Sequence, residues 1–326
     1  MTPKTLEAQL TKYLADVHSI EEQALAQMKS APSLAGDPTL AEPFVRHLPE
    51  TEEHERLVRE RLQARDGQPV RLKDLAGTLT GKGFAAFAAS QPDAPGKLIA
   101  HAYSYEHMEE GAYALLSLLA ERLADAETLE VARRICRQEQ DMASRLEALF
   151  DQAVDASLRA KGADDPAEEL DKYLADAHAL EEQAVQLLSK GPDLAGDAEL
   201  ASAYEEHLAE TEEHRRLVEQ RLAARGAKPS KLKDAALRAG ALNWGAFFAA
   251  QPDTPAKLCG FAYAFEHLEI AGYELLRRVA DRAGDPESAQ TAERILAEER
   301  GAAEKLRSLF PQALDASLRD QRLPAR

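Results

Sequence analysis

Glutamate and histidine side chains recur at helical spacing through the sequence, among residues that are mostly apolar. Glu50 and His54 are four residues apart, which places a carboxylate and an imidazole on one face of a helix. Glu106 and Glu109 are three residues apart, and Glu139 belongs to a stripe of small and apolar residues. Carboxylates bind hard cations, and imidazole binds iron, manganese or zinc. The pattern predicts a metal site, because several buried carboxylates are costly without a compensating cation.

The same pattern returns 160 residues later without insertion or deletion. Thr-Glu-Glu-His at 51–54, for example, returns at 211–214. A period this long indicates a domain duplication rather than a solenoid of short repeats. We place the two domains at residues 1–160 and 161–326. The simplest interpretation is an internal pseudo-dimer, in which the two copies associate within one chain. Two independent domains joined by a linker are the alternative.

Each copy is predicted to be helical, because alanine, leucine, glutamate, arginine and glutamine are abundant and favour helices. Asp or Thr followed by Pro marks helix N-termini at 2–3, 37–38, 165–166 and 285–286. We expect helices at about 3–30, 38–65, 94–123 and 126–150 in the first copy, and at about 163–190, 198–225, 254–283 and 286–310 in the second.

The connections between these helices define the expected topology. Within each copy, the first two helices and the last two are joined by short links. A long connection at 66–93, with a glycine-rich piece and an apolar segment at 84–89, separates the two pairs. Short-long-short connections are typical of ferritin-like bundles. The predicted fold class is therefore all-α, with two tandem ferritin-like four-helix bundles.

Every predicted helix carries a glutamate near its middle, on the face that should point into the bundle. In the first copy we expect Glu50 and Glu139 to bridge a metal pair, Glu21 and Glu106 to be terminal ligands, His54 to be the nitrogen ligand and Glu109 to be a mobile carboxylate. The second copy repeats these candidates as Glu210, Glu299, Glu181, Glu266, His214 and Glu269. The expected cofactors are two metal ions per copy, iron or manganese, with zinc as an option. The alternative is that these glutamates lie on solvated faces or pair with Arg and Lys.

Other polar residues near these stripes have different expected roles. His47 and His207 are expected at the surface or beside a ligand. Tyr113 and Tyr273 should be core residues that form a hydrogen bond with a carboxylate. His107 and His267 should form hydrogen bonds at a helix interface, and for His18, His178, Glu53 and Glu213 a place among the ligands or beside them stays open.

The two copies differ next to a candidate ligand. Pro49 precedes Glu50, whereas the second copy has Ala209 at this position. A proline inside a helix removes a backbone hydrogen bond and bends the helix. The helix of the first copy is therefore expected to be bent or broken there, and if one copy alone binds metal, we expect it to be the second. The copies also differ at Glu110, where the second copy has Ile270.

Composition excludes several classes of partner. The chain has 40 basic and 57 acidic residues, a formal net charge of −17, which argues against a nucleic-acid-binding protein. Its two cysteines do not form a disulfide framework or a zinc–thiolate motif. No apolar run reaches the roughly 18 residues of a membrane span, and no apolar signal core follows Met1. We expect a cytoplasmic protein whose partners are metal ions, without nucleic acid or membrane, and homo-oligomers stay open.

The motifs also resemble a known family. The runs His-Leu-Pro-Glu-Thr at 47–51, His-Leu-Ala-Glu-Thr at 207–211, Glu-His-Leu-Glu-Ile-Ala-Gly-Tyr at 266–273 and Leu-Ala-Glu-Glu at 296–299 are similar to those of the YciE/YciF-like bacterial ferritin-like proteins, a DUF892-type domain of unknown function associated with stress responses. The resemblance covers nearly the whole of each copy. It implies a cytosolic ferritin-like fold with a di-metal site. Family members are typically single-domain proteins that form dimers, so the tandem fusion is a departure.

Three functions fit these observations. The first is a di-iron or di-manganese oxidoreductase that reacts with peroxide or dioxygen and oxidises ferrous iron or removes peroxide under stress. The second is a protein that binds or stores metal without turnover. The third is a helical interaction module that has lost its metal chemistry. We favour the first, because all four helices contribute an inward glutamate.

Overall fold

The protein is helical throughout the part that its structure describes. The computed structural model describes residues 3–68, 94–160, 166–229 and 253–325, and all the elements in these ranges are helices. The chain divides into two compact units, Met1–Lys161 and Gly162–Arg326, called unit one and unit two below. Most of the predicted long connection, including its apolar segment at 84–89, lies outside the described residues, and so does Asp165.

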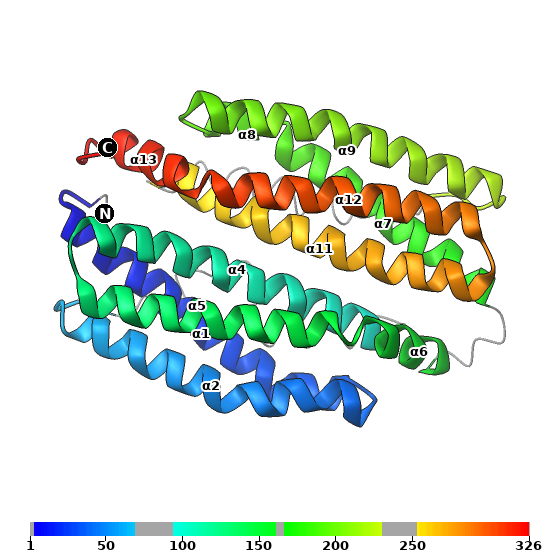
Figure 1. Cartoon of the computed structure of the whole chain (residues 1–326), viewed down its shortest axis with the longest axis horizontal. Helices are drawn as coiled ribbons and strands as arrows, with labels where there is room; N and C mark the ends of the chain where they lie inside the picture. The colour runs from blue at the N-terminus through cyan, green and yellow to red at the C-terminus, as the bar shows by residue number, and fades with distance from the viewer. Residues whose placement is uncertain (1–2, 69–93, 161–165, 230–252, 326) are drawn as a thin grey trace. The chain divides into compact units, whose positions relative to one another are not determined.

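The described residues of unit one form four long helices and one short helix. These are α1 (Leu6–Leu34), α2 (Pro38–Gln63), α4 (Ala94–Arg122), α5 (Ala126–Glu147) and α6 (Phe150–Ala160) (Figure 1). Helix α1 packs against α2 and α4, and α5 packs against the same two helices, so the four long helices form a closed bundle. Because the links from α1 to α2 and from α4 to α5 are short, each of these pairs is antiparallel.

The direction of α2 relative to α5 completes the topology. Arg61 near the end of α2 pairs with Asp125 at the start of α5, at 3.3 Å. The two helices are therefore antiparallel, and α2 and α4 run in the same direction. The end of α2 and the start of α4 therefore lie at opposite ends of the unit. Parallel second and third long helices are the arrangement of a ferritin-like bundle, as the sequence predicts.

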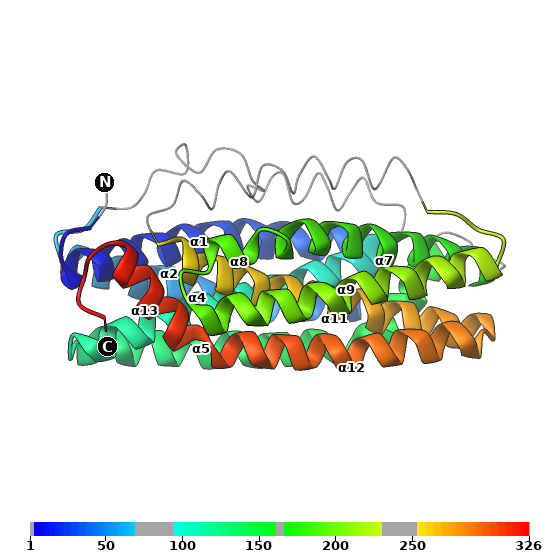
Figure 2. The same ribbon diagram turned by 90° about the horizontal axis from the view of Figure 1, so that it is seen from above.

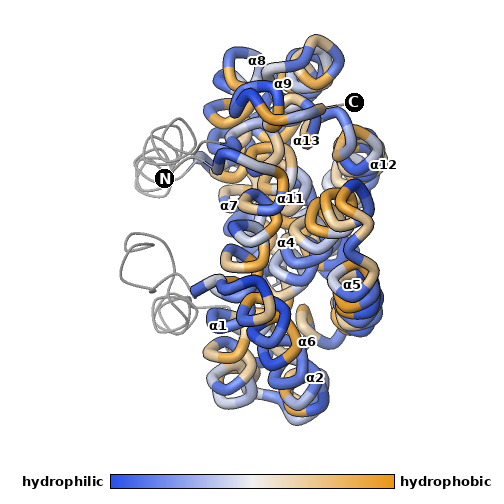
Figure 3. Tube along the Cα trace, turned by 90° about the vertical axis from the view of Figure 1, so that its left-hand side faces the viewer, coloured by the Kyte–Doolittle hydropathy of each residue, from blue (hydrophilic) through white to orange (hydrophobic). Residues whose placement is uncertain are grey.

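Unit two repeats the arrangement. Its helices are α7 (Pro166–Leu188), α8 (Gly191–Leu194), α9 (Ala198–Ala224), α11 (Thr254–Ala283), α12 (Pro286–Ser308) and α13 (Phe310–Asp320). The long helices lie side by side along the length of the unit (Figure 2). Apolar and polar positions alternate around the turns of the helices, as expected for amphipathic helices that bury one face (Figure 3).

The helix starts follow from capping side chains. Asp37 and Asp285 accept backbone hydrogen bonds from Thr39 and Ser288, at 2.9 Å in both cases, which confirms two of the predicted starts. The predicted start at Thr2 is wrong. Helix α1 begins at Leu6, because the hydroxyl of Thr5 caps its first turn.

The short helices α6 and α13 differ from the prediction of a single helix at the end of each copy. Helix α5 ends at Glu147, and α6 begins at Phe150, which is fully buried. The hydroxyl of Ser157 in α6 accepts the N–H of Gly96 at 2.8 Å, and Ser317 in α13 does the same for Ala256. Each short helix therefore caps the start of α4 or α11, whose first N–H groups have no partner inside their own helix.

Helix α2 is continuous through Pro49, so the expected break at this proline is wrong. The surrounding bundle holds the helix together, since side chains on both sides of the proline, such as Phe44, Val58 and Leu62, are buried in the core. The polar cluster described below forms in unit one as well as in unit two.

Candidate metal centre

A cluster of six polar side chains lies in the interior of unit one. Its members come from all four long helices and are almost fully buried: Glu21 from α1, His47 and His54 from α2, Glu106 and Glu109 from α4, and Glu139 from α5. Four carboxylates and two imidazoles are the donor set that ferritin-like bundles use for a metal pair.

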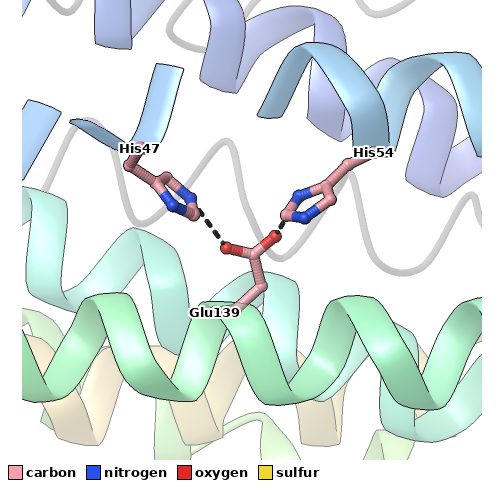
Figure 4. A group of neighbouring side chains, drawn as sticks. All are labelled: His47, His54 and Glu139. Carbon is pink, nitrogen blue, oxygen red and sulfur yellow. Dashed lines mark hydrogen bonds and ion pairs between the residues drawn. The ribbon is translucent and has the colours of Figure 1, made fainter. Parts of the chain in front are cut away.

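Glu139 lies at the centre of this cluster, between the two histidines (Figure 4). Its Oε2 is 3.1 Å from Nε2 of His47, and its Oε1 is 2.8 Å from Nδ1 of His54. Glu106 lies on the His47 side, with 3.7 Å between Oε2 and Nε2 of His47. Glu21 lies on the His54 side, with 3.9 Å between Oε1 and Nδ1 of His54. One carboxylate thus joins two halves of the cluster, each with its own histidine and its own further glutamate.

Unit two contains the same cluster at the positions 160 residues later. One ligand atom from each of His207, Glu266, Glu269 and Glu299 lies within 4.8 Å of the others, and the same holds for Glu181, His214 and Glu299. Glu299 therefore belongs to two groups, each with one histidine. Its Oε2 is 3.3 Å from Nε2 of His207, and its Oε1 is 2.9 Å from Nδ1 of His214.

Several buried oxygens of the clusters lack a hydrogen-bond donor among the described residues. They include Oε2 of Glu21, Oε1 of Glu109 and both oxygens of Glu269. Buried polar atoms without partners are rare in folded proteins. One ligand atom from each of Glu21, Glu109 and Glu139 lies within 4.8 Å of the others, and Glu269 lies in a similar group with Glu266 and Glu299, so several carboxylates crowd each cluster. Only a proton or a cation can relieve this repulsion, and the residues present therefore fit a metal site.

The pKa values of the cluster glutamates are shifted by burial and by this repulsion. Burial, reinforced by the charge of Glu139, raises the pKa of Glu21 to about 8 and the pKa of Glu106 and Glu109 well above the usual range. Burial acts in the same direction on Glu139, but hydrogen bonds from His47 and His54 outweigh it and lower the pKa of Glu139 to about 2. The shifts favour the ionised form of Glu139 and the protonated form of its carboxylate neighbours in the metal-free protein.

Groups around the cluster orient its histidines. Nδ1 of His47 is 2.7 Å from Oε2 of Glu50, so His47 donates Nδ1–H to Glu50 and directs Nε2 into the cluster. His54 has the opposite orientation: Nδ1 faces the cluster, and Nε2–H is donated to Oε1 of Gln138 at 3.3 Å. Hydrogen bonds of this kind fix the tautomer of a ligating histidine.

A tyrosine completes each cluster, as the sequence predicts. The hydroxyl of Tyr113 in α4 donates a short hydrogen bond to Oε1 of Glu21, and Tyr273 in α11 does the same for Glu181. Both tyrosines are fully buried. The hydroxyl therefore fixes the oxygen that lies 3.9 Å from Nδ1 of the histidine, and the other oxygen has no hydrogen-bond donor among the described residues.

The structure differs from two of the expectations drawn from the sequence. The structure does not bring Glu50 or Glu210 into the clusters. Their side chains are 30% and 50% exposed, and they bind Nδ1 of His47 and His207 instead. The expectation that His47 and His207 lie at the surface is wrong, because both are buried with Nε2 among the carboxylates. The spacing of seven residues between His47 and His54, two helical turns, was the signal for a shared face.

The remaining candidate residues form contacts outside the clusters. Glu53 is partly exposed and pairs with Arg56, so it is not part of the cluster. His18 is buried but contacts Glu55 at 3.0 Å, outside the cluster. His107 shares a hydrogen bond with Glu110, three residues later on the same helix, at 2.9 Å. In unit two, Glu213 pairs with Arg216, His178 contacts Glu219, and His267 donates to the carbonyl of Tyr263.

Fold and site together define a tandem four-helix bundle protein of the ferritin-like class, with a buried carboxylate–histidine cluster in each unit. The model of the family described as a domain of unknown function (DUF892) matches residues 5–159 and again residues 165–319. The chain belongs to this family and carries two tandem copies of its domain. No solved structure was found that matches the chain. Among the described helices, none has the length and apolar character that a membrane span requires.

Proposed function

We propose that each unit binds a pair of divalent metal ions, iron or manganese, and uses the pair to oxidise ferrous iron or to reduce peroxide or dioxygen. The observation that carries the proposal is the shared carboxylate. Glu299 belongs to two buried groups of possible ligands, one with His207 and one with His214. A carboxylate with one oxygen directed at each group is suited to bridging two cations.

Charge balance supports a pair of ions rather than one. Each cluster holds four carboxylates, which carry four negative charges when all are ionised. Two divalent cations supply four positive charges and leave both histidines neutral, as metal ligands must be. A single divalent ion would leave two negative charges in an interior where each costs several kcal/mol.

The chain assigns a distinct task to each group around the pair. His207 and Glu266 would hold one ion, His214 and Glu181 the other, and Glu299 would bridge them. Glu269 is fully buried, both its oxygens lack a hydrogen-bond donor among the described residues, and it lies in the group of His207, so it would be a further ligand on that side of the pair. Iron or manganese bound there would supply one-electron redox changes at two adjacent centres.

With ferrous iron as the substrate, the reaction balances without a further reductant. Two ferrous ions and two protons convert one molecule of hydrogen peroxide into two molecules of water and leave two ferric ions. Burial raises the pKa of Glu21 and Glu181 to about 8, which favours the protonated carboxyl near neutral pH. Metal ions held by these carboxylates would displace the protons. This chemistry removes both ferrous iron and peroxide, which suits a role in stress.

A second candidate is a protein that holds metal without turnover. The burial of the cluster favours it, because all six cluster side chains of unit one are almost inaccessible to solvent and a substrate would have to enter between the helices. The two candidates share the metal pair and differ in reactivity, so one experiment can separate them.

The test starts from protein purified without chelator or affinity metal. Elemental analysis should give about two ions of iron or manganese per unit. Metal-free protein reloaded with ferrous ion under anaerobic conditions should then consume peroxide or oxygen in proportion to the bound iron. A double variant with Glu139→Ala and Glu299→Ala should lose both metal and reactivity, whereas Glu293→Gln, an exposed carboxyl on α12, should retain them. Iron that binds but does not react would support the second candidate, and protein that takes up no metal would exclude both.

A further inference from the structure

The two clusters differ in the outer hydrogen bond of one histidine. Nε2 of His54 in unit one lies 3.3 Å from the amide oxygen of Gln138. Nε2 of His214 in unit two lies 2.7 Å from Oε2 of Glu298. Positions 138 and 298 are equivalent in the two copies, so the same imidazole donates its outer N–H to a neutral amide in one unit and to a carboxylate in the other.

The carboxylate of Glu298 is held in place for this contact. Arg294, one helical turn earlier on α12, donates from Nε to Oε1 of Glu298 at 3.2 Å. Oε2 is left for His214. The side chain of Glu298 is only 32% exposed, which protects the interaction with the imidazole from full screening by water. Arg294 therefore helps to orient Glu298 toward His214.

The carboxylate that accepts from the other histidine also differs between the two units, and its surroundings are more negative in unit two. In unit one, Glu50 accepts from His47 and also contacts Arg145 at 3.4 Å, which reduces the negative charge that His47 senses. In unit two the residue equivalent to Arg145 is Lys305, which pairs with Glu206 rather than with Glu210. Both outer contacts therefore place a carboxylate beside the imidazoles of unit two. Arg294 offsets part of the charge of Glu298, but the amide of Gln138 in unit one carries no charge at all.

The electronic effect of this contact on a ligand is well defined. A carboxylate that accepts the outer N–H of an imidazole pulls the proton toward itself and makes the inner nitrogen a stronger donor. A neutral amide oxygen does this much more weakly. Loss of such an outer partner typically lowers metal affinity about 10- to 100-fold.

We propose that the two units bind metal with different affinity, that unit two fills first, and that the residue at positions 138 and 298 sets the difference. Gln138 and Glu298 are positioning residues, since each acts through a histidine and does not touch the metal. The inference rests on the proposed metal pair and adds that one chain contains two unequal centres.

The experiment uses the full chain in metal-free form and titrates it with Mn²⁺, whose free ion is measured by electron paramagnetic resonance. The expected isotherm has two classes of about two ions each, with affinities about tenfold or more apart. The variant Glu299→Ala should remove the tighter class and leave the weaker class unchanged.

Reciprocal substitutions test the residue itself. Glu298→Gln should weaken the tighter class about 10- to 100-fold, and Gln138→Glu should strengthen the weaker class by a similar factor. The gain in the second variant cannot result from a folding defect. Glu293→Gln removes an exposed negative charge from the same helix α12 and should change neither class.

The outcomes separate the inference from the proposed function. A single class of four equal sites, or two classes that ignore both substitutions, would overturn the inference and leave the metal pair intact. Mn²⁺ that fails to bind to any form of the chain, with Fe²⁺ failing in the same way, would overturn the proposed function together with the inference.

Discussion

Replacing Glu21 and Glu181 by glutamine should stabilise the metal-free protein. Both glutamates are completely buried, and each accepts a hydrogen bond from a tyrosine. Burial, with a contribution from the charge of Glu139 or Glu299, raises the pKa of each to about 8 from an ordinary value of 4.5. Glutamine keeps the shape and the oxygen that the tyrosine binds, and its NH₂ group meets the neighbouring carboxylates.

The size of the effect follows from the linkage between protonation and folding. The folded protein retains these protons up to about pH 8, whereas the unfolded chain releases them above pH 4.5. The stability of the metal-free protein therefore falls as pH rises through this window. One pH unit corresponds to about 1.4 kcal/mol. At pH 7, which is 2.5 pH units above 4.5, ionisation in the unfolded chain has lowered the free energy of unfolding by roughly 3 kcal/mol for each glutamate. Glutamine does not ionise and avoids this loss.

The double variant should thus equal the native chain at pH 4.5 and exceed it by roughly 3 kcal/mol per unit at pH 7. For units of this size the gain corresponds to a rise in Tm of about 6–12 °C. Thermal and urea unfolding of the chelator-treated full chain, followed by circular dichroism across this pH range, measures it. Glu293→Gln is the control. A variant no more stable than the native chain at pH 7, or equally stabilised at pH 4.5 and 7, would refute the reasoning.

Other perturbations should act at separate points of the same molecule. Tyr273→Phe should lower the stability of the metal-free chain by about 1 kcal/mol in urea unfolding, because Glu181 loses its donor. Asp285→Ala should cost about 1–2 kcal/mol at pH 7, since the cap of α12 and its pairs with Arg221 and Arg225 are lost. The pKa of Asp285 is lowered to about 2, so this contribution is present above pH 3.8 and fades toward pH 2, where unfolding of variant and native chain should coincide. Mn²⁺ affinity should fall between pH 8 and pH 6, with protons released on binding in weakly buffered solution, because hydrogen bonds to Glu299 outweigh burial and raise the pKa of His214 to about 9.

The fold was predictable because its determinants are local. Asp37 and Asp285 mark helix starts, and the link lengths alone order the four helices. Helices α6 and α13 were not predicted, because no glycine separates α5 from α6 and the break depends on tertiary contacts. Phe150 is buried against Tyr103, with ring centroids 5.5 Å apart, and Ser157 caps a distant helix.

The sequence located the candidate site along each helix to within about one turn, but it did not decide which of two neighbouring polar residues points inward. Glu139 is inward by its position in the apolar stripe, and the structure places it at the centre of the cluster. Glu50 and His47 share a face within about 60° in the helix, so spacing alone does not say which of them points inward. The packing of α2 against α5 decides this, because it turns His47 toward Glu139 and leaves Glu50 near Arg145 at the rim.

The tandem arrangement has a genetic consequence. In a symmetric dimer of single-unit chains, one gene encodes both halves, and every substitution appears twice. Here the two copies are separate stretches of one gene, so a codon at position 138 can change while the codon at position 298 does not. The amide of Gln138 and the carboxylate of Glu298 are one such divergence. Duplication followed by fusion thus gives each bundle its own evolutionary course, while translation still delivers the two in a fixed one-to-one ratio.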